Sequence, residues 1–477
     1  MNRMKAPWVW LFILANLGGC MLGPDYRENP PAVPDRWQAG QGASAELKAV
    51  DPQTLKDWWK SYGDTGLDRL MKQALTANLD IKIALTRIAQ ARAERSGTRA
   101  ELFPKMNLAV GASRYENPLP GLAPGTRFNF FQLGFDTVWE IDLFGRQRRR
   151  LEAASAELDM AGEQYRFALV TLTAEVARGY IEYRNLQNQQ IITRANLAAQ
   201  QQILNLTETL FREGVGTRYE VVRARALTET TTAQLPALEA RQTGALRQLE
   251  VLVGRQPGTL DTELNDLGAV PMAPGKEILA TPAATIRHRP DLRIAERRLA
   301  AATALQGSAI AELFPKISLS AFFGFRNTDL DALFKSAAFS YSTAANLLQP
   351  LLNFGRIRAG IDLAEAKQQE AYLAYEKAVL EALQETETAM TRYLNEEIRR
   401  QTLSRAVADL REAVRLSQLR FHEGAVSFLD VLDAQRAQYA GEIELARSEA
   451  EASTDLIAVY KALGGGANAQ PQLSQRE

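Results

Sequence analysis

The chain has 477 residues, enough for two or three ordinary domains or for one large repeated architecture. Lys and Arg total 56, as do Asp and Glu, so no net charge attracts the chain to nucleic acid or to an acidic surface. With 46% hydrophobic and 23% charged residues, the composition is that of a folded protein and not of a disordered one.

The N-terminus has the order of a secretory signal peptide. A basic start precedes an apolar run over 8–14, which is too short to span a bilayer. The run leads into Leu-Gly-Gly-Cys at 17–20, which resembles a bacterial lipobox, so we expect Cys20 to become the lipidated first residue. A signal peptide with a chance cysteine is the alternative. Cys20 is the only cysteine in the sequence, so its lipidation would leave no thiol for disulfides or catalysis.

Two halves of the chain share short motifs at an offset of 210 or 211 residues. The matches are Ala100–Lys105 with Ala311–Lys316, Phe144–Arg146 with Phe354–Arg356, Tyr183 and Asn185 with Tyr393 and Asn395, Phe211–Gly214 with Phe421–Gly424, and Leu252–Gly254 with Leu463–Gly465. Chance could give one such match but not five in register. The sequence therefore predicts two copies of one unit, repeat 1 over 67–254 and repeat 2 over 280–465.

The remaining segments flank or join the repeats. We assign them as a lipoprotein signal peptide (1–19), a lipidated N-terminal segment (20–66), a linker or equatorial segment (255–279) and a polar C-terminal tail (466–477).

Each repeat reads as helix, strand, strand, long helix, turn and helix. The predicted first helices are 67–102 and 283–313, the long helices are 147–210 and 356–419, and the first returning helix is 217–254 with a kink at Pro236. A helix over 147–210 would be about 95 Å long, which is far beyond a compact domain. Such a helix cannot bury a face alone, so we expect it to pack against other long helices.

Four segments alternate between apolar and polar residues with the period of a strand. The clear ones lie within 131–140 and 317–326, and weaker ones at 106–110 and 339–342. The clear runs are about ten residues long, as membrane strands require. A soluble β-sandwich, with one face of each sheet exposed to water, is the alternative.

The strand count predicts oligomerisation. No segment beyond the signal peptide approaches the roughly 18 apolar residues of a membrane helix, so any spanning falls to the strands. Unpaired strand edges in lipid cost several kcal/mol for each backbone group, and single-chain bacterial barrels begin at about eight strands. One chain offers four, so several chains would have to close one barrel.

Ordered motifs along nearly the whole chain resemble the TolC/OprM-type outer-membrane factors and, within them, the NodT-like efflux lipoproteins. The motifs are Gly23–Tyr26, Asp57–Trp59, Gly63–Asp64, Trp139–Arg146, Arg289–Arg293, Leu429–Gln435 and Tyr460–Gly465. The resemblance implies a mainly α-helical fold that forms a homotrimer. Its twelve-stranded barrel takes four strands from each chain, and its twelve helices form a long periplasmic tunnel. It also implies docking to a periplasmic adaptor (membrane fusion) protein and an inner-membrane RND pump that supplies the energy.

The expected function is that of a passive outer-membrane conduit in a Gram-negative cell, exporting drugs or other small toxic compounds. A conduit of a type I protein secretion system is the nearest alternative, and a periplasmic adaptor or scaffold and a periplasmic enzyme are more distant ones. We expect no cofactor except the lipid on Cys20. We also expect no catalytic or metal site, because the sequence has no phosphate-binding Gly-rich motif and its two histidines, His288 and His422, lack metal-ligand spacing.

The turns that follow the long helices are the predicted functional region. By resemblance, the periplasmic gate comprises Leu429, Asp430, Asp433 and Glu220, and the adaptor-contact tip comprises Phe211, Gly214, Phe421 and Gly424. The alternative for the acids is that they favour the first turn of a helix. Unit charges about 10 Å apart in water repel by only about 0.4 kcal/mol. We therefore expect Asp433 to set ion preference, and Leu429 and helix packing to close the pore.

The basic tether that some members of the family carry is missing. Those members have a basic residue at the position of Val426, where it is linked to the acid of the other repeat. Valine cannot make this link, so the sequence does not show which residues tether the closed tip.

Overall fold

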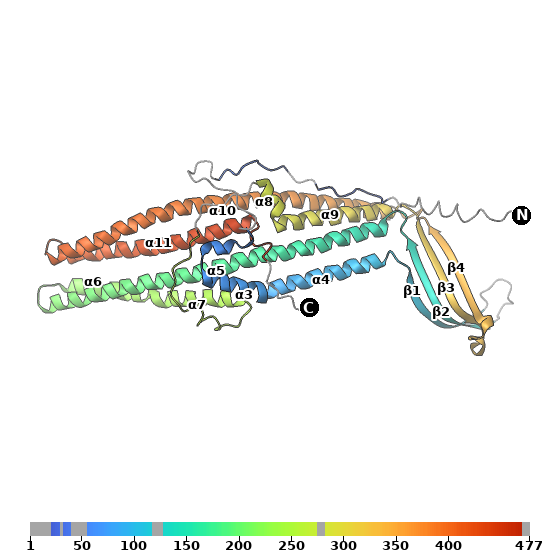
Figure 1. The fold of residues 1–477 in the computed structure, drawn as a ribbon, viewed down its shortest axis with the longest axis horizontal. Helices are drawn as coiled ribbons and strands as arrows, with labels where there is room; N and C mark the ends of the chain where they lie inside the picture. Colours follow the sequence, from blue (N-terminus) through green and yellow to red (C-terminus); the bar gives the residue numbers. More distant parts are fainter. Residues whose placement is uncertain (1–20, 29–31, 40–54, 117–126, 274–281, 470–477) are drawn as a thin grey trace. The chain divides into compact units, whose positions relative to one another are not determined.

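The computed structural model describes residues 21–28, 32–39, 55–116, 127–273 and 282–469, without the side chains of 283, 284 and 286. The elements in chain order (Figure 1) are η1 (Trp58–Tyr62), α3 (Thr65–Ala77), α4 (Leu79–Ala100), β1 (Lys105–Glu116), β2 (Arg127–Ile141), α5 (Arg146–Arg212), α6 (Arg218–Thr232), α7 (Gln234–Leu252), α8 (Pro282–His288), α9 (Pro290–Ala311), β3 (Lys316–Asn327), η2 (Leu330–Ala332), η3 (Ser336–Ala338), β4 (Phe339–Leu348), α10 (Arg356–His422) and α11 (Phe428–Ala462). In this part of the chain, no helix has the length and apolar character needed to cross a membrane.

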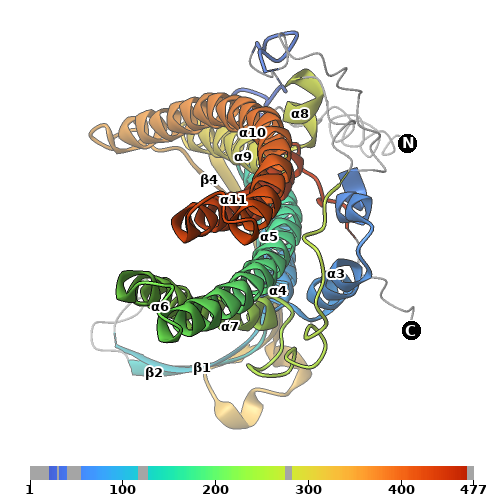
Figure 2. The same ribbon diagram turned by 90° about the vertical axis from the view of Figure 1, so that its left-hand side faces the viewer.

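The chain divides into two compact units. Unit 1 comprises Met1–Pro30, Arg87–Gly162 and Ile294–Glu376, and unit 2 comprises Pro31–Thr86, Glu163–Arg293 and Lys377–Glu477. The sheet lies in unit 1. The turns that join the long helices to the returning helices lie in unit 2, where Figures 1 and 2 show α6 beside α5 and α11 beside α10.

The predicted long helices are confirmed, because α5 and α10 each have 67 residues. Each begins after a glycine with positive φ, Gly145 at 83° and Gly355 at 86°. The left-handed conformation, which glycine adopts without a steric penalty, turns the chain from the preceding strand into the helix. This requirement explains why a glycine precedes the long helix in both repeats.

The predicted single helix over 67–102 is wrong, because α3 and α4 are separated at Asn78. The backbone of Asn78 leaves the helical conformation with ψ of 135°, and its Oδ1 accepts the N–H groups of Asp80 at 2.8 Å and Ile81 at 3.1 Å. The asparagine side chain thus satisfies the first free donors of α4 and starts a new helix.

The predicted helix over 283–313 is wrong for a related reason. α8 ends at His288 and α9 begins at Pro290. Proline disfavours the helical conformation in the residue before it. It fits the first position of a new helix, because a backbone N–H at that position would have no partner within the helix.

The predicted single returning helix over 217–254 with a kink at Pro236 is wrong, because the chain divides it into two helices at Ala233, three residues before the proline. α6 ends at Thr232, and α7 starts at Gln234 with Pro236 in its first turn, where an N–H is not required. The matching helix of repeat 2, α11, has 35 residues without a break.

All four predicted strands are present, and they form one antiparallel sheet in unit 1 with the order β1-β2-β3-β4. Leu108, Phe135, Phe323 and Tyr341 lie opposite one another across the four strands, and all four are exposed in the single chain. The period-two pattern therefore places an exposed apolar row on one face of the sheet. The segment Asn117–Gly121, whose two prolines and glycine predict a turn between the first two strands, lies outside the described residues.

Phe322, which breaks the alternation, lies on the other face and is 4% exposed. The guanidinium carbon of Arg326 lies 3.6 Å from the centroid of the Phe322 ring. Gly134 and Gly324 are paired across β2 and β3, and a β-carbon on Gly134 would lie 2.7 Å from the Phe322 ring. The aromatic ring thus fills the space that the two glycines leave.

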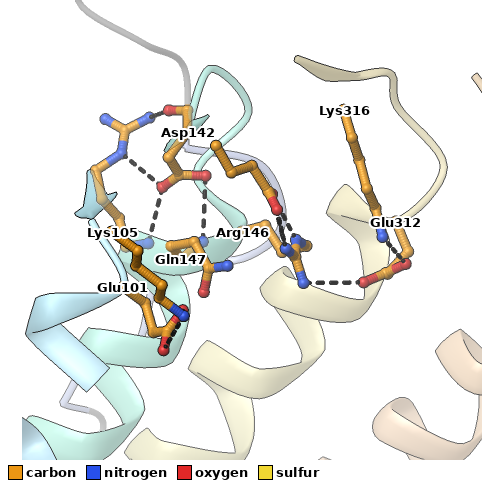
Figure 3. A network of polar contacts seen from close by, with 9 residues as sticks. Glu101, Lys105, Asp142, Arg146, Gln147, Glu312 and Lys316 are labelled. Carbon is orange, nitrogen blue, oxygen red and sulfur yellow. Dashed lines mark hydrogen bonds and ion pairs between the residues drawn. The ribbon is translucent and has the colours of Figure 1, made fainter. Parts of the chain in front are cut away.

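A polar network in unit 1 joins the strands to the helices (Figure 3). Asp142 accepts the backbone N–H groups of Gln147 at 3.1 Å and Arg148 at 2.8 Å, which caps the N-terminus of α5. Arg146 binds both carboxylate oxygens of Glu140, at 2.7 and 2.8 Å. The carboxylates therefore fix the direction in which the long helix leaves β2.

The main apolar core lies in unit 2. It gathers side chains of α3, α5, α7 and α11 around fully buried members such as Leu67, Tyr180, Leu249 and Ile457. The Tyr180 hydroxyl is bonded to Asp64 Oδ1 at 2.9 Å, so the buried phenol has a polar partner.

Candidate functional site

The two predicted tip glycines shape the turns after the long helices. Gly214 has φ of 75° and Gly424 has φ of 72°. The following amides return to the helix, since Val215 donates to the Leu210 carbonyl at 3.0 Å and Ala425 donates to the Arg420 carbonyl at 2.8 Å. Both turns are glycine-terminated helix ends, so the repeated glycine is explained by the backbone conformation that the turn needs.

Two of the predicted gate acids are engaged in capping boxes. Glu220 accepts the Thr217 N–H at 2.7 Å at the start of α6. Asp430 accepts the Ser427 hydroxyl at 2.7 Å and the Ser427 N–H at 2.9 Å at the start of α11, and these bonds hold the pKa of Asp430 below its usual value. Their local role is the helix-start role stated as the alternative. A gate role for either acid stays a prediction.

Asp433 has a partner that the sequence analysis missed. Arg223 Nη2 donates to Asp433 Oδ1 at 3.1 Å, from α6 of repeat 1 to α11 of repeat 2. Arg223 stands 210 positions before Asp433, so the two are equivalent residues of the two repeats. The repeat offset was the available sequence signal for this pair. The pair links the two repeats, as a basic residue at the position of Val426 does in some members of the family.

The apolar side chains at the turns form a small cluster. Leu204, Val221, Ala224, Phe428 and Leu432 are buried together, with Phe421 packed against them. The ring centroids of Phe421 and Phe428 are 5.8 Å apart.

The remaining apolar residues of the predicted site are more exposed. Leu429 is half-buried, whereas Phe211 in the first turn is 44% exposed. The structure therefore gives the two predicted tip phenylalanines different environments, with Phe421 packed in its own chain and Phe211 accessible.

Cys20 lies outside the described residues, but the segment after it is held firmly in unit 1. Arg149 is 1% exposed and donates to the carbonyls of Leu22 at 3.0 Å and Gly23 at 3.1 Å and to Asp25 Oδ1 at 2.7 Å. Further along, the Tyr26 hydroxyl donates to Glu296 Oε1 at 2.9 Å. One buried guanidinium thus binds three acceptors of the N-terminal segment.

An open cavity of about 400 Å³ lies between α5, α10 and α11 in unit 2, and charged side chains of both signs line it. Among these are Glu175, Arg178, Glu385, Arg392, Asp455 and Lys461. Burial raises the pKa of Asp455 to about 6, helped by the negative charges of Glu396 and Glu451 and opposed by Arg392. The carboxyl therefore titrates in a range where most aspartates are fully charged.

This raised pKa predicts a pH-dependent stability. Unfolding returns Asp455 to a pKa near 3.8, so its charge disfavours the folded state above about pH 6, and the penalty fades as the pH falls towards 4. Asp455→Asn is expected to stabilise the protein at pH 7.5 by about 1 kcal/mol, since water screens the half-exposed group. Thermal unfolding in detergent at pH 4.5 and 7.5 measures the effect.

The control is Asp409→Asn, at an exposed position of α10. It is expected to leave the pH profile unchanged. An Asp455→Asn gain of equal size at both pH values would contradict the assignment.

The fold is that of the TolC-like outer-membrane channels. The solved outer-membrane channel OprN matches the structure with a TM-score of 0.88 and 33% sequence identity, over 94% of this chain and 100% of that one. The chain belongs to the outer membrane efflux protein family, whose model matches residues 70–255 and 282–465.

Relatives of known role match nearly the full length. Nodulation protein T of Rhizobium leguminosarum bv. viciae is 31% identical over 97% of this chain and 94% of its own. The toluene efflux pump outer membrane protein TtgI of Pseudomonas putida is 31% identical over 97% of this chain and 99% of its own. The chain is thus an efflux channel protein of the outer membrane, and its family is one of channels and not of enzymes.

Proposed function

We propose that this protein is the outer-membrane end of a tripartite, RND-type efflux system, a passive conduit that exports drugs or other small toxic compounds. The observation that carries the proposal is the combination, in one chain, of a four-stranded sheet with an exposed apolar row and two 67-residue helices. A sheet face of this kind suits lipid, and long helices suit the wall of a tunnel.

The proposed assembly is a homotrimer. β1 and β4 are the outer strands of the four-stranded order, so each has one edge that pairs with no strand among the described residues. In hydrocarbon such edges are costly, and three chains would remove them by forming a closed barrel of twelve strands. The apolar face would then meet lipid, and the face with Arg326 would line the lumen.

Lipidation of Cys20 would add an anchor beside the barrel. The lipobox supports it, as does the binding of Leu22, Gly23 and Asp25 by Arg149 immediately afterwards. A single acyl chain binds a membrane only weakly, so several chains on one trimer, together with the barrel, would hold the protein in the outer membrane.

The turns of unit 2 are the proposed contact with a periplasmic adaptor, which connects the channel to an inner-membrane pump. Phe211, Gly214 and Gly424 are exposed there, and Phe421 is half-buried. Backbone at glycine turns and an accessible aromatic ring are surfaces to which a partner helix can pack closely.

Leu429 is the proposed apolar closure of the gate. Leu429→Ala shortens a half-buried side chain at the start of α11, so we expect cells carrying the variant to admit large antibiotics at least several-fold faster than wild type. Uptake of an antibiotic normally excluded by the outer membrane measures this. Leu419→Ala, at an exposed site on α10, is the control and is expected to leave uptake unchanged. Equal uptake in the Leu429→Ala and wild-type strains would refute the role of Leu429 in closing the gate.

Asp433 is the proposed determinant of ion preference. Asp433→Asn removes one charge and leaves Arg223 without its carboxylate partner, so the cation-to-anion permeability ratio is expected to fall about two-fold, as an interaction near 0.4 kcal/mol implies. Arg223→Gln is expected to raise the same ratio. Reversal potentials in a lipid bilayer with a salt gradient provide the measurement, and an unchanged ratio in both variants would count against the assignment.

A deletion strain tests the function itself. Loss of the gene is expected to increase accumulation of small toxic compounds, and the wild-type gene is expected to restore their export. Normal accumulation of small molecules together with loss of a secreted protein would favour the type I secretion conduit instead.

A further inference from the structure

The equivalence of the two repeats is visible in side-chain contacts at the junction between sheet and helices in unit 1. Two interactions occur in both repeats at mapped positions. The first is an ion pair, Glu101–Lys105 in repeat 1 and Glu312–Lys316 in repeat 2, each with a hydrogen bond of 2.8 Å. The second is a hydrogen bond from a side chain to a backbone carbonyl. Trp139 donates to Leu102 at 3.0 Å, and Gln349 donates to Leu313 at 3.1 Å. The offsets of 210 and 211 residues therefore hold for structure as well as for sequence.

Two other contacts at this junction join repeat 1 to repeat 2 within the chain. The rings of Phe144 and Phe314 stack with centroids 5.0 Å apart and planes 29° apart. Arg146 donates to Glu312 at 3.4 Å (Figure 3). We call these four residues the junction clamp. Phe144 lies just before α5, Arg146 is the first residue of α5, and Glu312 and Phe314 follow α9.

The repeat mates of the junction clamp are exposed in the single chain. Phe354, the mate of Phe144, is 92% exposed, and Phe103, the mate of Phe314, is 56% exposed. Arg356 and Glu101, the mates of Arg146 and Glu312, are also exposed. The same two aromatic rings and the same two opposite charges are therefore present a second time, at positions that are exposed in the described part of the chain.

Phe354 has a further unusual feature, a φ of 49°. A bulky residue seldom adopts this left-handed conformation, and it persists where the surroundings hold it. In the single chain the ring of Phe354 makes few contacts, because it is almost fully exposed.

We propose that a second copy of this chain completes a second junction clamp. Phe354 of one chain stacks on Phe103 of the neighbouring copy, and Arg356 pairs with Glu101 of that copy. The inference rests on the proposed trimer and adds the residues that join its chains. In a ring of three chains, clamps within chains alternate with clamps between chains, because successive repeats meet in the same way whether or not a peptide linker connects them.

Chemical crosslinking of the full-length protein tests the pairing. The double variant Phe103→Cys with Phe354→Cys is treated in detergent with a short bifunctional thiol reagent and then fully denatured. We expect most of the protein to run as covalent dimers and trimers. Each single variant is expected to stay monomeric on the gel, since residues at one position in different copies lie far apart.

The matched control is Phe144→Cys with Phe314→Cys, which should crosslink within one chain and give no larger species. Suppose that the undenatured sample is trimeric and the control pair reacts. If the Phe103→Cys, Phe354→Cys protein then gives only monomers on the gel, the proposed contact is wrong, whereas the trimer itself is not contradicted. An undenatured sample that is monomeric would instead refute the proposed assembly.

A charge swap gives an independent readout if the cysteine variants fold poorly. Arg356→Glu would face Glu101 of the neighbouring copy, so the temperature at which the trimer dissociates is expected to fall by several degrees. Adding Glu101→Arg is expected to restore part of the loss, because the same change also removes the ion pair between Glu101 and Lys105. A double variant no more stable than the single one would contradict the pairing.

Discussion

Gly324→Ala is expected to abolish the sheet and, with it, the stable assembly. Gly324 and Gly134 face one another across β3 and β2, and a β-carbon on Gly324 would press on the Cα of Gly134 and on the Leu133 carbonyl oxygen. Both are backbone atoms, closer than non-bonded atoms come, so the central strand pair would have to separate. The amount of protein in the outer-membrane fraction and its heat-dependent migration on gels measure the loss.

Gly111→Ala is the matched control on β1. The new β-carbon would meet Cγ of Gln132 at 3.1 Å, and that flexible side chain can move aside. We expect this variant to assemble like wild type. Equal assembly of the Gly324 and Gly111 variants would show that the close approach of the two glycines does not determine the sheet.

Arg149→Ala is the substitution expected to destabilise the N-terminal segment most. Arg149 is 1% exposed and binds two backbone carbonyls and two carboxylates, those of Asp25 and Glu152. Its removal leaves the carbonyls of Leu22 and Gly23 without their donor and opens a void under the segment. The expected loss is about 3 kcal/mol of unfolding free energy.

Thermal unfolding of the purified protein in detergent measures this loss. Arg150→Ala, at the neighbouring exposed position, is the control and is expected to unfold within about 0.5 kcal/mol of wild type. Similar unfolding of both variants would contradict the role of Arg149 in binding the segment.

The strands and the long helices could be predicted from the sequence because their signals are periodic or repeated. The helix break at Asn78 could not, since asparagine is only mildly unfavourable in a helix and the break depends on its side chain bonding the next amides. The break before Pro290 did carry a signal, because proline favours the first position of a helix. The side-chain hydrogen bonds of Asn78 and the backbone restriction of Pro290 therefore decided the helix boundaries that periodicity missed.

The predicted tip was readable in part. Thr217 with Glu220 and Ser427 with Asp430 have the spacing of capping boxes, so their local roles could be recognised from sequence. The partner of Asp433 was different. The repeat offset of 210 residues relates Arg223 to Asp433, but whether two equivalent residues bond to each other depends on which helix faces meet in three dimensions.

The most direct test of the shared channel is the mass and the activity of the purified full-length protein. Measured in detergent, the particle is expected to have three times the chain mass of 52.8 kDa, after the detergent and the predicted signal peptide of each chain are subtracted. The same sample is expected to open discrete ion-conducting pores in a planar lipid bilayer. A monomeric particle that forms no pores would contradict the conclusion that several chains pool their strands into one conduit.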